Sequence, residues 1–133
     1  MTATIALVDD DRNILAAVSI ALQAEGFATR IYADGETALK ALLENPPDLA
    51  IFDIKMPRMD GLEVLRQIRS AEELKRLPVV ILSSSREESD LARSWDLGVN
   101  AYVVKPVDID QFFQAVKTLG TFWAVINETP TLD

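Results

Sequence analysis

Four short apolar runs recur along the chain, at 5–8, 49–52, 79–82 and 101–104. Each is rich in branched aliphatic residues and lacks strict alternation of apolar and polar positions. That pattern is typical of strands buried on both faces of a parallel sheet. A weaker fifth segment, 27–31, contains polar residues and fits an edge strand better. The pattern therefore predicts five strands.

Helical spacing fills the segments between these strands. Apolar residues three or four positions apart form stripes within 14–22, 38–43, 62–68 and 109–119, and a more polar helix is predicted over 87–97. Gly26 and Gly98 would end two of these helices, and Asp108 is a candidate N-cap for the last. Regular alternation of strands and helices predicts an α/β fold, a doubly wound, mainly parallel sheet with helices on both faces.

Composition narrows the possible functions. The 133 residues fit one domain. A net charge of −8 argues against binding to nucleic acid or to an anionic membrane. The chain has no Cys and no His, so thiol chemistry, phosphohistidine and Cys- or His-based metal sites are excluded on this chain. No apolar run is long enough to span a bilayer, and we expect a cytoplasmic protein.

Reactive side chains cluster at the predicted strand ends. Asp9 and Asp10 follow the first strand, Asp53 ends the third, Ser83 follows the fourth and Lys105 follows the fifth. Ligand sites in such sheets lie outside the carboxyl ends of the strands, so these residues can converge. Each alone would be a common turn or loop former, and for Asp11 we prefer the role of a helix cap.

Three carboxylates in one pocket raise one another's pKa values unless a cation is present. An oxygen-only ligand set fits Mg²⁺, which would be held by Asp9, Asp10 and Asp53 together with a backbone carbonyl, that of Lys55. With the metal and the Lys105 ammonium nearby, Asp53 could attack phosphorus. These residues therefore predict an aspartyl-phosphate site.

Four motifs in order resemble the receiver domain family of response regulators. The resemblance implies a flavodoxin-like fold with strand order 2-1-3-4-5, a receiver domain over 1–119, and a phosphorelay partner, a sensor histidine kinase. The motifs are the acidic segment at 5–11, the phosphoacceptor signature at 47–61, the hydroxyl strand at 78–83 and the lysine strand at 101–106.

The resemblance also implies a role for each site residue. Asp53 would be the phosphoacceptor, Ser83 would bind the phosphoryl group, and Lys105 would pair with it next to a cis bond to Pro106. Asp10 would bind Mg²⁺ directly and Asp9 through a water. Ser83 and the aromatic Tyr102 would be the switch residues; Tyr102 also fits a half-buried strand aromatic, and the two roles are compatible.

The C-terminal segment, 120–133, departs from a bare receiver. Residues 119–126 carry no charge, although the strand–helix pattern is already complete. The segment could pack back on its own domain, but we expect a homodimer interface formed by Phe122, Trp123, Val125 and Ile126. This tail resembles that of single-domain regulators partnered with bacterial and cyanobacterial phytochromes, which implies a light-sensing kinase.

Other classes fit less well. A phosphatase of the haloacid dehalogenase type needs a second Asp two residues after the nucleophile, where this chain has Lys55, so we do not expect a turnover enzyme. Three anions after the first strand would repel the phosphate of a flavin, and no length remains for a DNA-binding domain. A constitutive, unphosphorylated docking module remains the main alternative.

Overall fold

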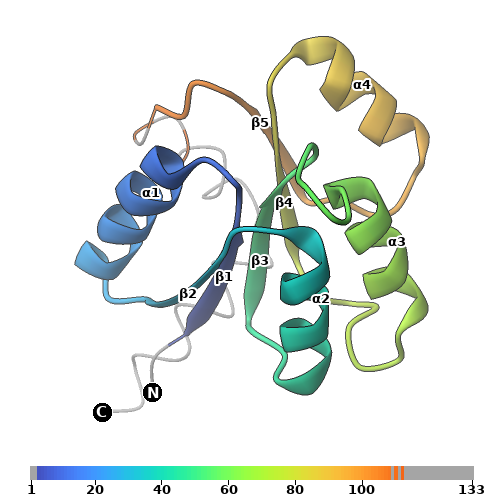
Figure 1. The fold of residues 1–133 in the computed structure, drawn as a ribbon, viewed down its shortest axis with the longest axis horizontal. Helices are drawn as coiled ribbons and strands as arrows, with labels where there is room; N and C mark the ends of the chain where they lie inside the picture. Colours follow the sequence, from blue (N-terminus) through green and yellow to red (C-terminus); the bar gives the residue numbers. More distant parts are fainter. Residues whose placement is uncertain (1–2, 109, 111, 113–133) are drawn as a thin grey trace.

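Residues 3–108, 110 and 112 are described by a computed structural model of the chain (Figure 1). In this part of the chain, five parallel strands form one sheet in the order β2-β1-β3-β4-β5. The strands are β1 (Thr4–Val8), β2 (Ala28–Tyr32), β3 (Leu49–Asp53), β4 (Val79–Ser83) and β5 (Ala101–Val104). The helices are α1 (Arg12–Ala24), α2 (Gly35–Glu44), α3 (Gly61–Ser70) and α4 (Arg86–Ser94). The predicted fold class and strand order are confirmed.

Each face of the sheet carries its own hydrophobic core, because successive strand residues point to opposite sides. On one face, Leu15, Val18 and Leu22 of α1 belong to a core that also contains residues of β1, β3 and β4. On the other face, α2, α3 and α4 cover a second core that includes Phe52 and Leu65 (Figure 1). The central strands are thus covered on both sides, and their carboxyl ends are held in fixed positions.

Each described helix begins at a polar residue whose side chain accepts a hydrogen bond from a backbone N–H of the first turn. These N-caps are Asp11, Asp34, Asp60 and Ser85. Such caps satisfy backbone donors that have no partner within the helix. The expected cap at Asp11 is confirmed, and Gly26 follows α1 with φ of 94°, which glycine adopts without steric cost.

Strand β5 differs from its prediction. Its apolar run predicted burial on both faces, but β5 lies at an edge of the sheet and is only partly buried, with Val104 42% exposed. An apolar run reports the hydrophobicity of a segment and not its place in the sheet. The expectation that 27–31 forms an edge strand is confirmed by β2.

Helix α4 is shorter than predicted. It ends at Ser94, where the Trp95 N–H bonds to Ala92 O, and Asp96 has φ of 53°. This left-handed conformation prevents the helix from reaching Leu97. The predicted fifth helix, 109–119, and the interface residues Phe122, Trp123, Val125 and Ile126 lie outside the described residues, apart from Asp110 and Phe112 within that helix.

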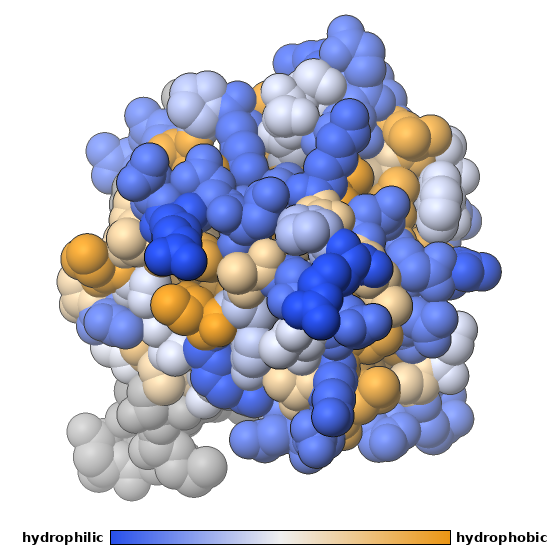
Figure 2. Space-filling model, viewed as in Figure 1, coloured by the Kyte–Doolittle hydropathy of each residue, from blue (hydrophilic) through white to orange (hydrophobic). Residues whose placement is uncertain are grey.

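Hydrophilic residues dominate the face drawn in Figure 2, and hydrophobic residues form small separate areas on it. The large apolar side chains with the greatest exposure in the described part of the chain are Ile20, Ile31, Leu43, Leu91, Trp95 and Val104. None of the described helices is both long and apolar enough to cross a bilayer.

Candidate functional site

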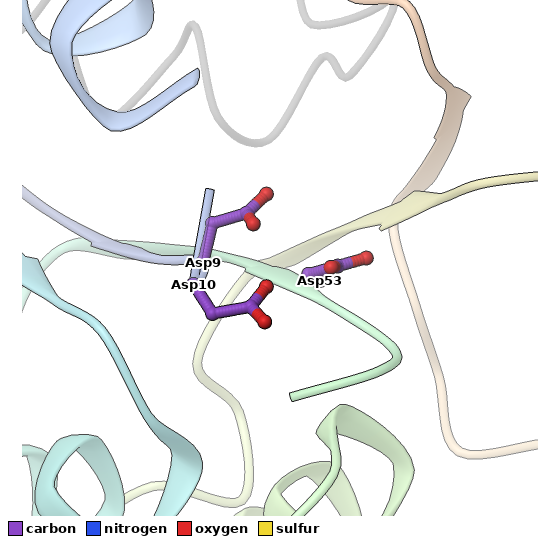
Figure 3. A group of neighbouring side chains, drawn as sticks. All are labelled: Asp9, Asp10 and Asp53. Atoms are coloured by element: carbon purple, nitrogen blue, oxygen red, sulfur yellow. The ribbon is translucent and has the colours of Figure 1, made fainter. Parts of the chain in front are cut away.

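Three carboxylates meet at the carboxyl edge of the sheet. Strands β1 and β3 are parallel neighbours with Val8 opposite Phe52, so Asp9, Asp10 and Asp53 emerge at the same level. Each offers an oxygen atom within 4.8 Å of those of the other two. Figure 3 shows Asp9 and Asp10 extending from the end of β1 toward the side where Asp53 lies. The predicted convergence of the three aspartates is therefore found in the structure.

Lys105 reaches the same place from the end of β5. Its Nζ lies 3.0 Å from Oδ2 of Asp53, to which it donates a hydrogen bond, and 3.0 Å from Oδ2 of Asp9. The side chain of Lys105 is 19% exposed, whereas Asp9 is fully buried and Asp53 nearly so. The bond from Lys105 to Pro106 is cis, as expected. The lysine is thus an internal partner of two carboxylates.

Burial controls the protonation of this cluster. It is the largest cause that raises the pKa of Asp53 to about 6; Asp9 adds to the rise, and Lys105 opposes it. Burial also raises the pKa of Asp9, although the hydrogen bond from the Asp11 N–H and the interactions with Lys105 lower it in part. For Lys105, burial alone would lower the pKa, but its hydrogen bonds and charge interactions with Asp53 and Asp9 raise it above the usual value.

One buried oxygen of the cluster has no hydrogen bond. Among the described residues, Oδ2 of Asp9 is the only buried side-chain oxygen or nitrogen without such a bond, although it lies close to the Lys105 ammonium. Burying a carboxylate oxygen in this way is costly unless a cation compensates it. This oxygen, the exposed Asp10 and the oxygen-only donor set fit a hard divalent cation.

Ser83 lies at the end of β4, but its hydroxyl is engaged elsewhere. The side chain is completely buried, and its Oγ shares a hydrogen bond with Oγ of Ser89 in α4. No hydrogen bond joins this hydroxyl to Asp53 or Lys105 in the described part of the chain. The phosphoryl-binding role of Ser83 stays a prediction. In the structure its hydroxyl is hydrogen-bonded to Ser89 and not to the acidic cluster.

The remaining predicted residues flank the cluster. The Lys55 ammonium lies 3.6 Å from Oε2 of Glu88, and its side chain is largely exposed; the role of its backbone carbonyl stays a prediction. Tyr102 is half-buried, with the guanidinium carbon of Arg93 4.1 Å from its ring centroid. The position of Tyr102 agrees with a partly buried strand aromatic, and its switch role stays a prediction.

Two structural features near the site were not predicted from the sequence. Glu88 and Ser89, in the first turn of α4, are buried; Ser89 shares a hydrogen bond with Ser83 at the end of β4, and Glu88 accepts one from Ser84, which follows that strand. The spacing of Ser85 and Glu88 is that of a capping box and could have indicated the first of them. Gly61, within the phosphoacceptor signature, lets α3 approach the site, because a Cβ there would lie 2.1 Å from the Asp53 carbonyl oxygen.

The structure defines a doubly wound parallel α/β protein with carboxylates and a lysine gathered at the carboxyl edge of its sheet. The profile of the response regulator receiver domain matches residues 5–117. The chain belongs to the response regulator receiver domain family.

Three similar proteins support this assignment. Probable methanogenesis regulatory protein FilR2 of Methanothrix harundinacea (strain 6Ac) is 32% identical over 134 residues, covering 95% of this chain and 86% of FilR2. The structure of bacteriophytochrome response regulator RtBRR has a TM-score of 0.83 at 41% identity, covering 90% of this chain and 79% of RtBRR. The structure of the phosphorylated cyanobacterial phytochrome response regulator RcpA has a TM-score of 0.76 at 35% identity. The match covers 93% of this chain and 95% of RcpA.

Several other relatives are longer proteins. Response regulator MprA of Mycobacterium sp. (strain KMS) is 33% identical over 119 residues, but the chain covers only 51% of MprA. The chain therefore spans about half the length of this relative. What the similarity shows is the receiver part shared by these regulators.

Proposed function

We propose that this chain is a phosphorylation-dependent response regulator that accepts a phosphoryl group on Asp53 and signals through protein contacts. The single observation that carries the proposal is the buried cluster of Asp9, Asp53 and Lys105 beside Asp10. Desolvated carboxylates of like charge that lie side by side lower the stability of a fold. In a member of the receiver family, a function in phosphoryl transfer accounts for keeping such a destabilising cluster.

The chemical step is a transfer between an imidazole nitrogen of the donor and a carboxylate oxygen. An oxygen of Asp53 forms the new bond to phosphorus, the bond from phosphorus to the phosphohistidine nitrogen breaks, and the nitrogen keeps the electron pair. With a pKa of about 6, Asp53 is mostly ionised at neutral pH and can act as the nucleophile. The Lys105 ammonium, 3.0 Å from Oδ2, is placed to stabilise the charge that develops.

Mg²⁺ belongs to the proposed site. Asp9, Asp10 and Asp53 would hold it together with the Lys55 carbonyl, and when bound it would neutralise charge on the transferring phosphoryl group. Oδ2 of Asp9, buried without a hydrogen bond, supports this assignment. Ser83 is proposed to donate its hydroxyl to a phosphoryl oxygen after turning away from Ser89.

The test is the intact mass of the protein after incubation with acetyl phosphate and Mg²⁺. The expected result is a gain of one phosphate that disappears with a chelator and in an Asp53→Asn variant. An Asp90→Asn variant is the matched control, because Asp90 is an exposed aspartate on α4. If the parent gained no mass while it bound Mg²⁺, the proposal would be wrong and a constitutive docking module would be favoured.

The upstream partner is proposed to be a sensor histidine kinase, and specifically a phytochrome. Support comes from the similarity to RtBRR and RcpA, whose names place them with bacterial and cyanobacterial phytochromes. A cleft beside the site, lined by α1 residues such as Ile14 and by Pro106 and Val107, could receive the kinase. Phosphoryl transfer from an autophosphorylated bacteriophytochrome to the parent, and not to Asp53→Asn, is the expected result. A cytoplasmic location belongs to the same proposal.

Homodimerisation through 120–133 is proposed from the sequence, with Phe122, Trp123, Val125 and Ile126 at the interface. Sedimentation of the full chain and of a chain ending at Leu119, with and without beryllofluoride, would test it. The expected result is a dimer that the truncation converts to a monomer. An unchanged oligomeric state would contradict this assignment. The protein is proposed to act as a phosphoacceptor and not as a turnover enzyme.

A further inference from the structure

The hydroxyl of Ser83 has one hydrogen-bond partner in the described part of the chain, and that partner is not in the acidic cluster. Ser83 Oγ and Ser89 Oγ share a hydrogen bond, and both side chains are almost completely buried. A buried hydroxyl that loses its partner is destabilised, because no water replaces the lost bond. Ser83 therefore cannot turn toward Asp53 without leaving Ser89 unpaired.

The backbone around Ser83 is held in place by the neighbouring strands. The Lys105 N–H donates to the Ser83 carbonyl at 2.7 Å, and the Ile54 N–H donates to the carbonyl of Leu82 at 3.1 Å. These bonds fix the end of β4 between the end of β3, where Asp53 lies, and Lys105, which follows β5. The backbone of Ser83 is thus held by bonds that do not depend on the partner of its hydroxyl.

Ser89 is held in position by contacts that do not involve Ser83. The Ser85 side chain caps α4 by accepting from the Glu88 N–H at 3.1 Å. The Glu88 carboxylate accepts from the Ser84 N–H at 2.8 Å and from its hydroxyl at 3.1 Å, and it also lies near the Lys55 ammonium. The first turn of α4 is therefore anchored independently, and the Ser89 hydroxyl is a fixed acceptor or donor for Ser83.

We infer that Ser89 is a positioning residue that holds the Ser83 hydroxyl away from Asp53 in the unphosphorylated protein. This inference rests on the proposed function of Asp53 and Ser83. Phosphorylation must replace the Ser83–Ser89 hydrogen bond with one from Ser83 to a phosphoryl oxygen. The exchange leaves the Ser89 hydroxyl, which lies on α4, without its hydrogen-bond partner. Ser89 thereby sets the threshold for switching and links the site to α4.

The test is the affinity for beryllofluoride, a phosphoryl mimic, at saturating Mg²⁺. Intrinsic tryptophan fluorescence, to which Trp95 at the end of α4 contributes, would follow the titration. Ser89→Ala removes the competing partner, so we expect it to bind beryllofluoride about fivefold more tightly than the parent, as for loss of one hydrogen bond from the competing state. Ser94→Ala is the matched control on the same helix, because the exposed Ser94 hydroxyl donates to Leu91 O at the opposite end of α4 from Ser89; we expect no change.

A double-mutant cycle separates positioning from a general effect on α4. If Ser89 acts through Ser83, the Ser89→Ala change has no effect on affinity in a Ser83→Ala background. Tighter binding that persists there would overturn the inference, as would unchanged or weaker binding in Ser89→Ala alone. Ser89→Cys, which keeps a similar size and a weaker hydrogen bond, is expected to bind with intermediate affinity and serves if the alanine variant does not fold.

Failure of the proposed function would look different. A parent protein that binds no beryllofluoride, or an Asp53→Asn variant that binds it equally well, would contradict Asp53 as the phosphoacceptor, and the role of Ser89 with it. Binding that depends on Asp53 but is insensitive to Ser89 would leave the function intact and refute only the inference.

Discussion

Helices α3 and α4 cover the same face of the sheet but are attached to it differently. Helix α3 buries four apolar side chains: Leu62, Val64, Leu65 and Ile68. Helix α4 buries one apolar residue, Ala92, and two polar ones, Glu88 and Ser89. Burial of apolar side chains holds α3 against the sheet, whereas α4 is held largely by hydrogen bonds near the site. A helix attached in this way can shift when those bonds change, whereas α3 stays fixed.

This contrast suggests a division of labour within the receiver. Asp9 and Asp53 lie at the ends of β1 and β3, central strands covered on both faces. Tyr102 and the exposed Leu91 and Trp95 lie on β5, α4 and the end of α4, where burial is partial. The reactive carboxylates therefore lie on the firmly packed central strands. The residues expected to respond lie on β5 and α4, which bury few apolar side chains.

The largest expected difference is between matched leucine truncations in the two helices. Leu65→Ala, at a fully buried position of α3, should lower the free energy of unfolding by about 2–5 kcal/mol through cavity formation. Leu91→Ala, at a position of α4 that is 55% exposed, should change it by less than about 0.5 kcal/mol. Urea denaturation of both variants measures the difference. Equal losses would show that α4 is attached as firmly as α3.

Removal of Lys105 tests the chemistry of the acidic site. Lys105→Met should slow phosphorylation by acetyl phosphate about 100-fold, because the pre-positioned charge at the transferring group is lost. Lys75→Met is the control, since Lys75 pairs with an exposed Glu72 away from the site. The rates follow from the time course of intact mass. A Lys105→Met rate within a factor of about two of the parent would contradict the proposed role of its charge.

The raised pKa of Asp53 predicts a dependence of stability on pH in the absence of Mg²⁺. Its folded-state pKa of about 6 lies above the ordinary value of 3.8, so the folded state binds this proton more tightly than the unfolded state. The contribution of Asp53 to the free energy of unfolding should therefore fall as pH rises from about 4 to about 6 and stay low above that.

The Asp53→Asn substitution should abolish the fall in the free energy of unfolding that ionisation of Asp53 causes. At about pH 7.5 the variant should be more stable than the parent by on the order of 2 kcal/mol, and the difference should shrink near pH 4. Denaturation at several pH values in chelator measures both proteins. A variant less stable than the parent at neutral pH would contradict the assignment of Asp53 as a destabilising charge.

The smallest expected effect concerns the anchor of α4. Glu88→Ala removes the acceptor of the Ser84 N–H and hydroxyl, so amide hydrogen exchange in α4 should speed up about five- to tenfold. Exchange in α3 should stay unchanged. Glu87→Ala is the matched control, because Glu87 is exposed on the same turn. Equal acceleration in both helices would show that α4 and α3 open together.

Much of the fold and the placement of the site could be predicted from the sequence. The apolar runs located the strands, and the aspartates and Lys105 at their ends had to meet once the sheet was parallel. The apolar run of β5 did not indicate its exposure, because exposure depends on the place of a strand in the sheet and not on its composition; only the strand order implied by the family resemblance puts β5 at an edge. The end of α4 depends on a left-handed residue, Asp96, which no apolar pattern marks.

The pairing of Ser83 with Ser89 shows a second kind of limit. The motif identified Ser83 as a hydroxyl near the phosphoacceptor, but a motif does not specify a side-chain rotamer. That choice depends on the position of α4, which in turn depends on the contacts of Glu88 with Ser84 and Lys55. Such contacts depend on how α4 lies against the end of β4 and the loop that carries Lys55, and they become visible only in three dimensions.

The central claim is that Asp53 becomes a mixed anhydride with phosphate. Borohydride reduces an acyl phosphate to an alcohol, so treatment after incubation with acetyl phosphate and Mg²⁺ would convert the phosphorylated aspartate to homoserine. Peptide mass analysis would then locate the change. The account predicts homoserine at position 53 and at no other aspartate or glutamate. Homoserine at Asp9 or Asp10, or none at all, would contradict it.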